Sequence, residues 1–253
     1  MFSLGAWMRR RRARRLPLSE PEFLATAARL PGMAQLPAAR LAQWQQLTRE
    51  FLSDKHIHGA GGLEPDAAMR QCIAQLATWP ILDLGYAALD GWHDVIVYPG
   101  AFRARRERHD EDIEHLVHEY EEELAGESMD HGPLVLSWDD ILTDLEHPEE
   151  MKSLVVHEIA HKLDGLSGAV NGAPPMRKSM SQQAWTEAFS AAFEAMNQQL
   201  DAEQETVLDP YAASAPEEFF AVMSEYHFIA PDLLAEVYPQ VAAQLRQFYG
   251  PSP

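Results

Sequence analysis

The segment HEIAH at residues 157–161 places two histidines four positions apart, with a glutamate directly after the first. Four residues correspond to about 400° of rotation and about 6 Å of rise on an α-helix, so His157 and His161 project from one face. Two such imidazoles can bind one zinc ion at about 2.0–2.1 Å. Glu158 lies about 100° further around the helix, where it can accept a proton from a zinc-bound water. The spacing therefore predicts a catalytic zinc site of the HExxH type.

The alternative is that these histidines lie on an ordinary surface or core helix without a metal. The apolar residues 154–156 before the motif and Leu163 after it favour a buried helix that presents the histidines to a site. We expect this helix to begin at Pro148, with Glu149 and Glu150 at its positive end. It should end near residues 164–165, where a glycine can adopt the left-handed cap conformation.

A catalytic zinc ion needs a third protein ligand and one open coordination position. One known arrangement takes the ligand six residues beyond the second histidine, after a glycine; here these positions hold Ser167 and Asp164, so that arrangement fails. Another takes a glutamate from a later helix, which we expect over residues 215–229. Ser214 and Glu217 have the spacing of a capping box, which leaves Glu218 as the predicted third ligand.

Glu225 follows Glu218 by seven residues and lies on the same face of that predicted helix. It could orient a ligating histidine through a hydrogen bond. A surface salt bridge is the alternative role for its carboxylate. His56 and His58 flank one residue and would share a face on a strand, but we expect them to be exposed loop residues rather than a second site.

Hydrophobic periodicity predicts helices over residues 41–52, 67–76, 148–164, 182–200 and 215–229. Segments 92–99 and 133–138 have the β-branched and aromatic composition of strands. Several helices with few strands indicate an α+β fold, mainly helical with a small mixed sheet. The strand at 134–138 could offer an edge that pairs with an extended peptide substrate.

The chain has 253 residues, enough for one good-sized domain, and its formal net charge of −19 argues against nucleic acid as a direct partner. A single cysteine, Cys72, excludes an internal disulfide and fits a cytoplasmic protein, and we expect Cys72 in the core. No apolar run approaches the length of a transmembrane helix. The acidic stretch from Glu107 to Glu127 is predicted to be a solvated helix face or a loop.

The first 15 residues contain six arginines and no acidic residue. We interpret residues 1–16 as a mobile basic tail and residues 17–253 as a single domain. An alternative is that Phe2, Leu4, Trp7 and the arginines touch an anionic membrane or partner.

The segments at 157–164 and 211–226 resemble the Mlc titration factor A family of zinc peptidases. Segments 81–85, 89–93 and 132–138 fit the same family, so the resemblance covers nearly all of the chain beyond the arginine-rich N-terminus. The core is also similar to the catalytic domain of anthrax lethal factor, which implies a zincin-like domain. The resemblance implies His157, His161 and Glu218 as ligands of one Zn²⁺ per chain and Glu158 as the base. It also assigns Tyr211 to the active site, where it would donate a hydrogen bond to the developing oxyanion.

This resemblance implies an aminopeptidase-like metallopeptidase with a peptide as substrate. It also implies regulation of sugar uptake through binding of a glucose-responsive transcriptional repressor. An alternative is a non-catalytic regulatory protein that only sequesters such a repressor. A third interpretation, a membrane- or nucleic-acid-binding module built on the arginines, predicts strongly salt-dependent binding.

Overall fold

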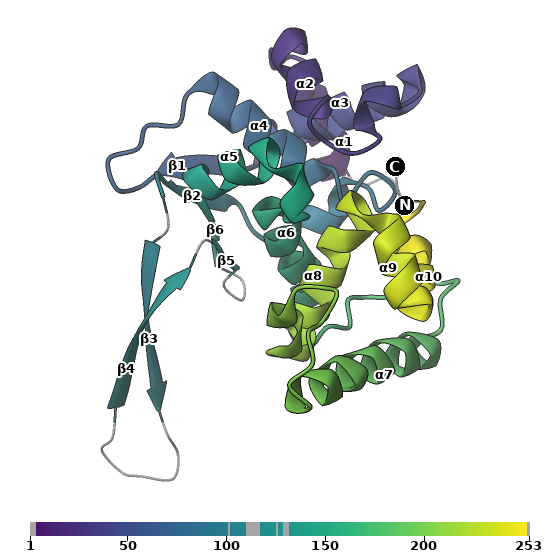
Figure 1. Cartoon of the computed structure of the whole chain (residues 1–253). Helices are drawn as coiled ribbons and strands as arrows, with labels where there is room; N and C mark the ends of the chain where they lie inside the picture. Colours follow the sequence, from purple (N-terminus) through teal and green to yellow (C-terminus); the bar gives the residue numbers. More distant parts are fainter. Residues whose placement is uncertain (1–3, 101, 110–116, 125, 129–131, 252–253) are drawn as a thin grey trace.

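The structure is a computed structural model that describes residues 4–100, 102–109, 117–124, 126–128 and 132–251. Helices dominate the described part, and their apolar faces form most of its core. The α-helices are α1 (Leu4–Ala13), α2 (Glu20–Ala27), α3 (Ala38–Asp54), α4 (Ala67–Thr78), α5 (Trp138–Glu146), α6 (Leu154–Asp164), α7 (Gln182–Asp201), α8 (Pro216–Ile229), α9 (Pro231–Val237) and α10 (Pro239–Tyr249), as labelled in Figure 1. The helices predicted over 41–52, 67–76, 182–200 and 215–229 are confirmed as α3, α4, α7 and α8.

The strands form a small sheet and a separate hairpin (Figure 1). The strands are β1 (His56–Gly59), β2 (Asp94–Tyr98), β3 (Phe102–His109), β4 (Val117–Leu124), β5 (Gly126–Ser128) and β6 (Leu134–Ser137). The sheet order is β1-β2-β6-β5, in which β1, β2 and β6 are parallel and β5 is antiparallel to β6. The expected α+β fold with a small mixed sheet is therefore confirmed.

The position of β6 corrects one expectation. Strand β6 lies between β2 and β5 and so has partners on both sides. Its side chains are all buried, as expected for an inner strand. The predicted substrate-pairing edge at 134–138 is therefore wrong, and among the described residues the edge strand on that side of the sheet is β5.

The acidic stretch from Glu107 to Glu127 also differs from our expectation. Strands β3 and β4 pair antiparallel, with Phe102 opposite Leu124 and His109 opposite Val117. Most of this stretch is therefore β-strand rather than a helix face or a loop, and residues 110–116 and 125 lie outside the described residues.

Aromatic side chains join the C-terminal helices into one packed body. Trp185 of α7 stacks on Phe189 at a centroid distance of 4.2 Å and meets Phe220 of α8 and Phe248 of α10 edge-on, each at 5.7 Å. Trp185, Phe220 and Phe248 are almost fully buried. Because large aromatic side chains bury much area in defined geometry, this cluster fixes α8, the helix that carries Glu218.

The arginine-rich segment forms helix α1, which packs against α3. Arg9 donates a hydrogen bond of 2.9 Å to Asp90 and lies 3.5 Å from the buried carboxylate of Glu50. The helix therefore contacts the body through Arg9, while the mobility of residues 1–16 as a tail stays a prediction. Trp7 and Met8 are about half exposed.

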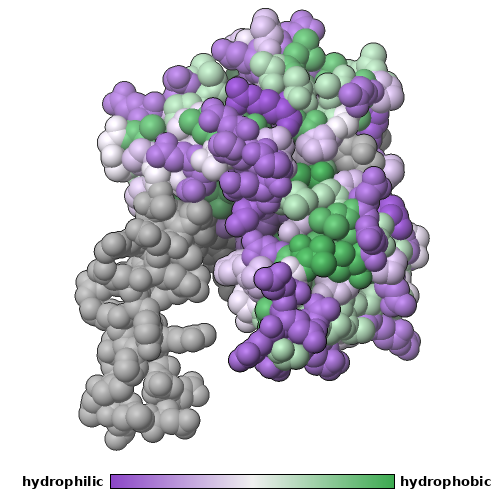
Figure 2. Space-filling model, in the orientation of Figure 1, coloured by the Kyte–Doolittle hydropathy of each residue, from purple (hydrophilic) through white to green (hydrophobic). Residues whose placement is uncertain are grey.

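Hydrophilic side chains cover most of the face shown in Figure 2, with a larger apolar area at the level of α8 and α9. Among the described residues, no helix combines the length and the apolar character that a membrane crossing would need. Cys72 is only partly buried, although it packs against the core as expected.

Candidate metal centre

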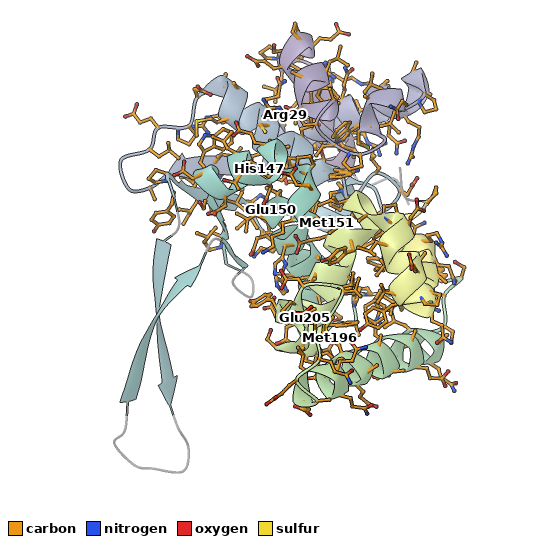
Figure 3. All side chains as sticks on the ribbon, in the orientation of Figure 1. Arg29, His147, Glu150, Met151, Met196 and Glu205 are labelled. Atoms are coloured by element: carbon orange, nitrogen blue, oxygen red, sulfur yellow. The ribbon has the colours of Figure 1, made fainter. Side chains whose placement is uncertain are left out.

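Helix α6 carries both histidines and begins later than the sequence predicts. The chain forms one 3-10 turn at Pro148–Glu150, and Met151 then takes a left-handed conformation with φ of 56°, which ends that turn. Figure 3 labels Glu150 and Met151. Ser153 is the N-cap of α6, and its hydroxyl accepts a hydrogen bond from the backbone N–H of Val156. The predicted start at Pro148 is therefore wrong.

The C-terminal end of α6 is confirmed at Asp164, but the predicted glycine cap is not. Gly165 keeps a right-handed φ of −63° and begins a short 3-10 turn, Gly165–Ser167. The left-handed position is Gly168, with φ of 88°. The left-handed glycine therefore comes one 3-10 turn later than predicted, at Gly168 and not at Gly165.

One face of α6 is buried, and the opposite face presents the histidines. Val155, Val156, Ile159, Ala160 and Leu163 are almost inaccessible. The side chains of His157 and His161 are 13% and 11% exposed, so both are partly open to solvent. Their Nε2 atoms lie 3.1 Å apart, as the spacing of four residues predicts.

Glu218 of α8 completes a cluster of three potential ligands. Its Oε2 lies 3.0 Å from Nε2 of His157 and 3.3 Å from Nε2 of His161. Ligand atoms at about 2.1 Å from a tetrahedral ion are about 3.4 Å apart. The three atoms therefore have the chemistry and nearly the spacing that a zinc ion requires.

The start of α8 brings Glu218 to this position for a different reason from the one we expected. The N-cap is Ala215, without a side-chain hydrogen bond, and Pro216 occupies the first position of the helix. The hydroxyl of Ser214 donates instead to the backbone oxygen of Tyr211. The predicted capping box of Ser214 and Glu217 is therefore wrong, although Glu218 is the glutamate that meets the histidines.

Glu225 contacts His157 from two turns further along α8. Its Oε1 lies 2.9 Å from Nδ1 of His157, and its Oε2 accepts a hydrogen bond of 2.6 Å from the backbone N–H of Ser153. Of the two roles that the sequence allowed, the structure has the one that orients a histidine.

Charges around the cluster shift the pKa values of its members. Burial would lower the pKa of His157, but hydrogen bonds with Glu218 and Glu225 raise it well above its ordinary value. Burial would raise the pKa of Glu218, but hydrogen bonds with His157 and His161 lower it below its ordinary value. In the metal-free protein, His157 and Glu218 therefore stabilise each other's charged forms.

Glu158 is buried beside this cluster. Only 3% of the residue is exposed, and no described residue donates a hydrogen bond to its Oε2 atom. Burial raises its pKa to about 7, against the opposing charges of His157, His161 and Lys162. A buried carboxylate with an unpaired oxygen is unfavourable for stability, which is typical of a group retained for chemistry.

Tyr211 lies at the rim of the cluster, on the 3-10 turn Pro210–Ala213 that leads into α8. Its ring centroid is 6.2 Å from that of His157, and the residue is half exposed. The backbone N–H of Tyr211 donates to the side chain of Asp209, which holds the turn. The structure therefore brings all five predicted site residues to one place.

Two side chains that the sequence analysis did not single out, Asp144 and Asp164, also support the site. Asp144 of α5 accepts a hydrogen bond of 2.7 Å from the N–H of Leu154, and burial raises its pKa to about 7. Asp164 accepts from the N–H groups of Asn171 and Gly172 at 2.8 and 2.6 Å. No local sequence pattern indicated a role for Asp144, because its partner lies on another helix. For Asp164, its place at the predicted end of α6 was a signal that could have indicated a structural role.

Two imidazoles and a carboxylate from two helices, with a buried glutamate beside them, are groups that could hold a metal ion. The sequence profile described as "Glucose-regulated metallo-peptidase M90" matches residues 4–250. The chain belongs to this metallopeptidase family, and membership implies a metal ion. The match starts at residue 4 and so includes the arginine-rich segment, which we had expected to lie outside the resemblance.

Curated relatives support the same family. The chain is 36% identical over 237 residues to "Mlc titration factor A" of Pectobacterium atrosepticum, covering 92% of this chain and 87% of the relative. Its identity to the protein of the same name from Escherichia fergusonii is 36% over 229 residues, covering 90% and 85%. The protein of that name from Salmonella agona is 35% identical over 229 residues, with the same coverage.

Proposed function

We propose that this chain is a zinc-dependent peptidase of zincin-like architecture, cytoplasmic and aminopeptidase-like in its action. The observation that carries the proposal is the convergence of His157 Nε2, His161 Nε2 and Glu218 Oε2 within 3.0–3.3 Å, next to the buried Glu158. Two imidazoles and one carboxylate are the protein ligands of a known class of catalytic zinc site. When bound, zinc would supply Lewis acidity and lower the pKa of a water molecule.

In this proposal each residue has a separate role. His157, His161 and Glu218 hold the metal, and Glu225 fixes the ring of His157 through Nδ1. Glu158 accepts a proton from the attacking water and returns it to the leaving amine. A carboxyl group whose pKa lies near 7 can both accept and donate a proton at neutral pH.

Tyr211 would donate a hydrogen bond from its hydroxyl to the oxygen of the scissile carbonyl. Its half-exposed position beside His157 leaves it accessible to a substrate. Such a donor stabilises the negative charge that develops in the transition state. The open edge of β5, on the side of the sheet that α6 contacts, is where we place an extended peptide substrate.

A paired comparison of two neighbouring glutamates tests the proposal. Glu218→Ala should abolish peptide hydrolysis and lower bound zinc in the purified protein, because it removes one of three ligands. Glu217→Gln, one residue earlier on α8, should retain both. Hydrolysis is followed with a peptide library, with and without a chelator, and zinc by elemental analysis. Full zinc retention by Glu218→Ala would rule out its role as a ligand.

A regulatory function has separate support from the relatives, which carry the name Mlc titration factor A. We propose that this chain also binds an Mlc-like transcriptional repressor and through it affects sugar uptake. Glu158→Gln distinguishes this function from hydrolysis: it should lose peptidase activity and keep binding to such a repressor. If wild type shows binding and no hydrolysis of any peptide, a non-catalytic sequestering role replaces the peptidase.

A further inference from the structure

Strand β1 carries two histidines on its exposed face. His56 and His58 are alternate residues of β1, so their side chains point to the same side, while Ile57 between them is 5% exposed and points into the core. The expectation that these histidines are loop residues is therefore wrong. Because β1 ends the sheet, nothing in the described part pairs with its outer side.

Asp94 of the neighbouring strand faces both histidines. The parallel register sets His56 opposite Asp94. Oδ1 of Asp94 lies 3.1 Å from Nε2 of His58 and 3.5 Å from Nδ1 of His56. One carboxylate oxygen is thus approached by a nitrogen from each imidazole, and the three ligand atoms all lie within 4.8 Å of one another.

We propose that His56, His58 and Asp94 form a second metal site, which binds a divalent transition-metal ion such as Zn²⁺. Two imidazole nitrogens and one carboxylate oxygen suit zinc, whereas Mg²⁺ and Ca²⁺ favour sites made of oxygen. The separations of 3.1 and 3.5 Å bracket the value of about 3.4 Å expected between ligands of a tetrahedral zinc ion. A water molecule would occupy the fourth coordination position of the ion.

The exposure of the three side chains determines how such a site behaves. They are 70%, 60% and 55% exposed for His56, His58 and Asp94. The ligands are therefore open to solvent on one side, and metal can enter and leave without movement of the fold. His93 stands close by, but its Nδ1 faces the backbone oxygen of Asp54 at 3.2 Å, so we assign it no ligand role.

This site is separate from the centre on α6. Helix α6 contacts β5 and β6, whereas His56 and His58 lie on β1, at the opposite end of the four-stranded sheet. Three strand spacings of about 4.8 Å place the two sheet edges about 14 Å apart. The two sites are therefore too far apart to form a single two-metal centre. The proposal of a second site does not depend on the proposed peptidase activity.

Counting bound metal tests the second site. The full-length chain is stripped with a chelator and dialysed against about 50 µM Zn²⁺, a concentration chosen to favour occupation of an exposed site. His58→Ala and Asp94→Asn should each bind one zinc ion fewer per chain than wild type. If both variants bind as many ions as wild type, the site does not exist.

A matched control separates the site from an ordinary histidine–carboxylate pair. His147, which follows α5 (Figure 3), lies 3.1 Å from Glu149 and is also exposed, but the described residues offer it no second imidazole. His147→Ala should therefore bind as many zinc ions as wild type. Loss of an equal amount of zinc from this variant would show surface adsorption and overturn the assignment.

Cobalt binding gives a readout that does not depend on the α6 centre. The Glu218→Ala variant loaded with Co²⁺ should absorb in the visible range, and this absorption should be lost when His58→Ala is added to the same chain.

Discussion

The carboxylate of Glu225 connects His157 to the beginning of the helix that carries it. Its Oε1 lies 2.9 Å from Nδ1 of His157, and its Oε2 accepts a hydrogen bond from the backbone N–H of Ser153, the N-cap of α6. One side chain of α8 therefore fixes both the ring of His157 and the position of the helix that carries it. With Nδ1 engaged by the carboxylate, Nε2 is the nitrogen that faces Glu218 and His161.

Glu225→Gln should weaken zinc binding by about 10–100-fold, because the group that orients His157 loses its charge. Zinc affinity is measured by competition with a chelator. Asp144→Asn serves as the comparison, since Asp144 also binds the N-terminus of α6, through Leu154, but contacts neither histidine. Asp144→Asn should reduce stability with a much smaller change in zinc affinity. Equal losses in both variants would show that Glu225 acts through the helix alone.

Glu158→Gln should stabilise the metal-free protein at alkaline pH. Burial raises the pKa of Glu158 from 4.5 to about 7, so ionisation is less favourable in the folded chain than in the unfolded one. The folded state therefore loses stability as pH rises from about 4.5 through about 7, by up to about 3 kcal/mol above that range. Denaturant unfolding should show the variant more stable than wild type at pH 8 and similar to it at pH 4. A variant without this pH-dependent difference would contradict the burial argument.

Tyr211→Phe should lower kcat by about 100–1000-fold and leave KM almost unchanged, because the lost hydrogen bond would form only with the developing oxyanion. Zinc content should not change, since the three proposed ligands are His157, His161 and Glu218. Steady-state kinetics on a cleaved peptide provide the measurement. A rise in KM with normal kcat would point instead to a role in substrate binding.

Gly172→Ala should destabilise the protein and disturb the zinc site. Gly172 has φ of 76°, and an added Cβ would lie 2.5 Å from the backbone oxygen of Pro216, at the start of α8. Gly168→Ala is the control, since Gly168 has φ of 88° but no described atom within 4 Å of the added Cβ. The control should lose about 1–2 kcal/mol from left-handed strain alone. Gly172→Ala should lose a further ~1–3 kcal/mol from the clash and bind zinc more weakly, as measured by unfolding and chelator competition.

Local patterns predicted most of the helices because their apolar spacing determines which face is buried. Helix α7 is an example: Trp185, Ala188, Phe189, Ala192 and Met196 follow helical spacing, and all are buried. The same reasoning placed His157 and His161 on one face. Both the helices and the shared face of the two histidines depend on contacts within a few residues.

The failures came where contacts between distant segments decide the outcome. Glu149 and Glu150 suggested a helix start, but Asp144 and Glu225 bind the N-terminus of α6 at residues 153–154 instead. Strand pairing also depends on the whole sheet, so β6 could not be identified as an inner strand from its own sequence. The meeting of His56 and His58 with Asp94 likewise depends on the register of β1 and β2.

Two proposed ligands of the α6 centre, His157 and Glu218, are 61 residues apart in the chain, and the whole of α7 lies between them. A bound ion would therefore act as a reversible cross-link that closes a long loop of the chain. In an unfolded chain this closure is entropically unfavourable, so the ion binds the assembled helices far more tightly than the separated ones. Metal supply would then determine how long the C-terminal half of the molecule survives heating or proteolysis, as well as whether it can carry out chemistry.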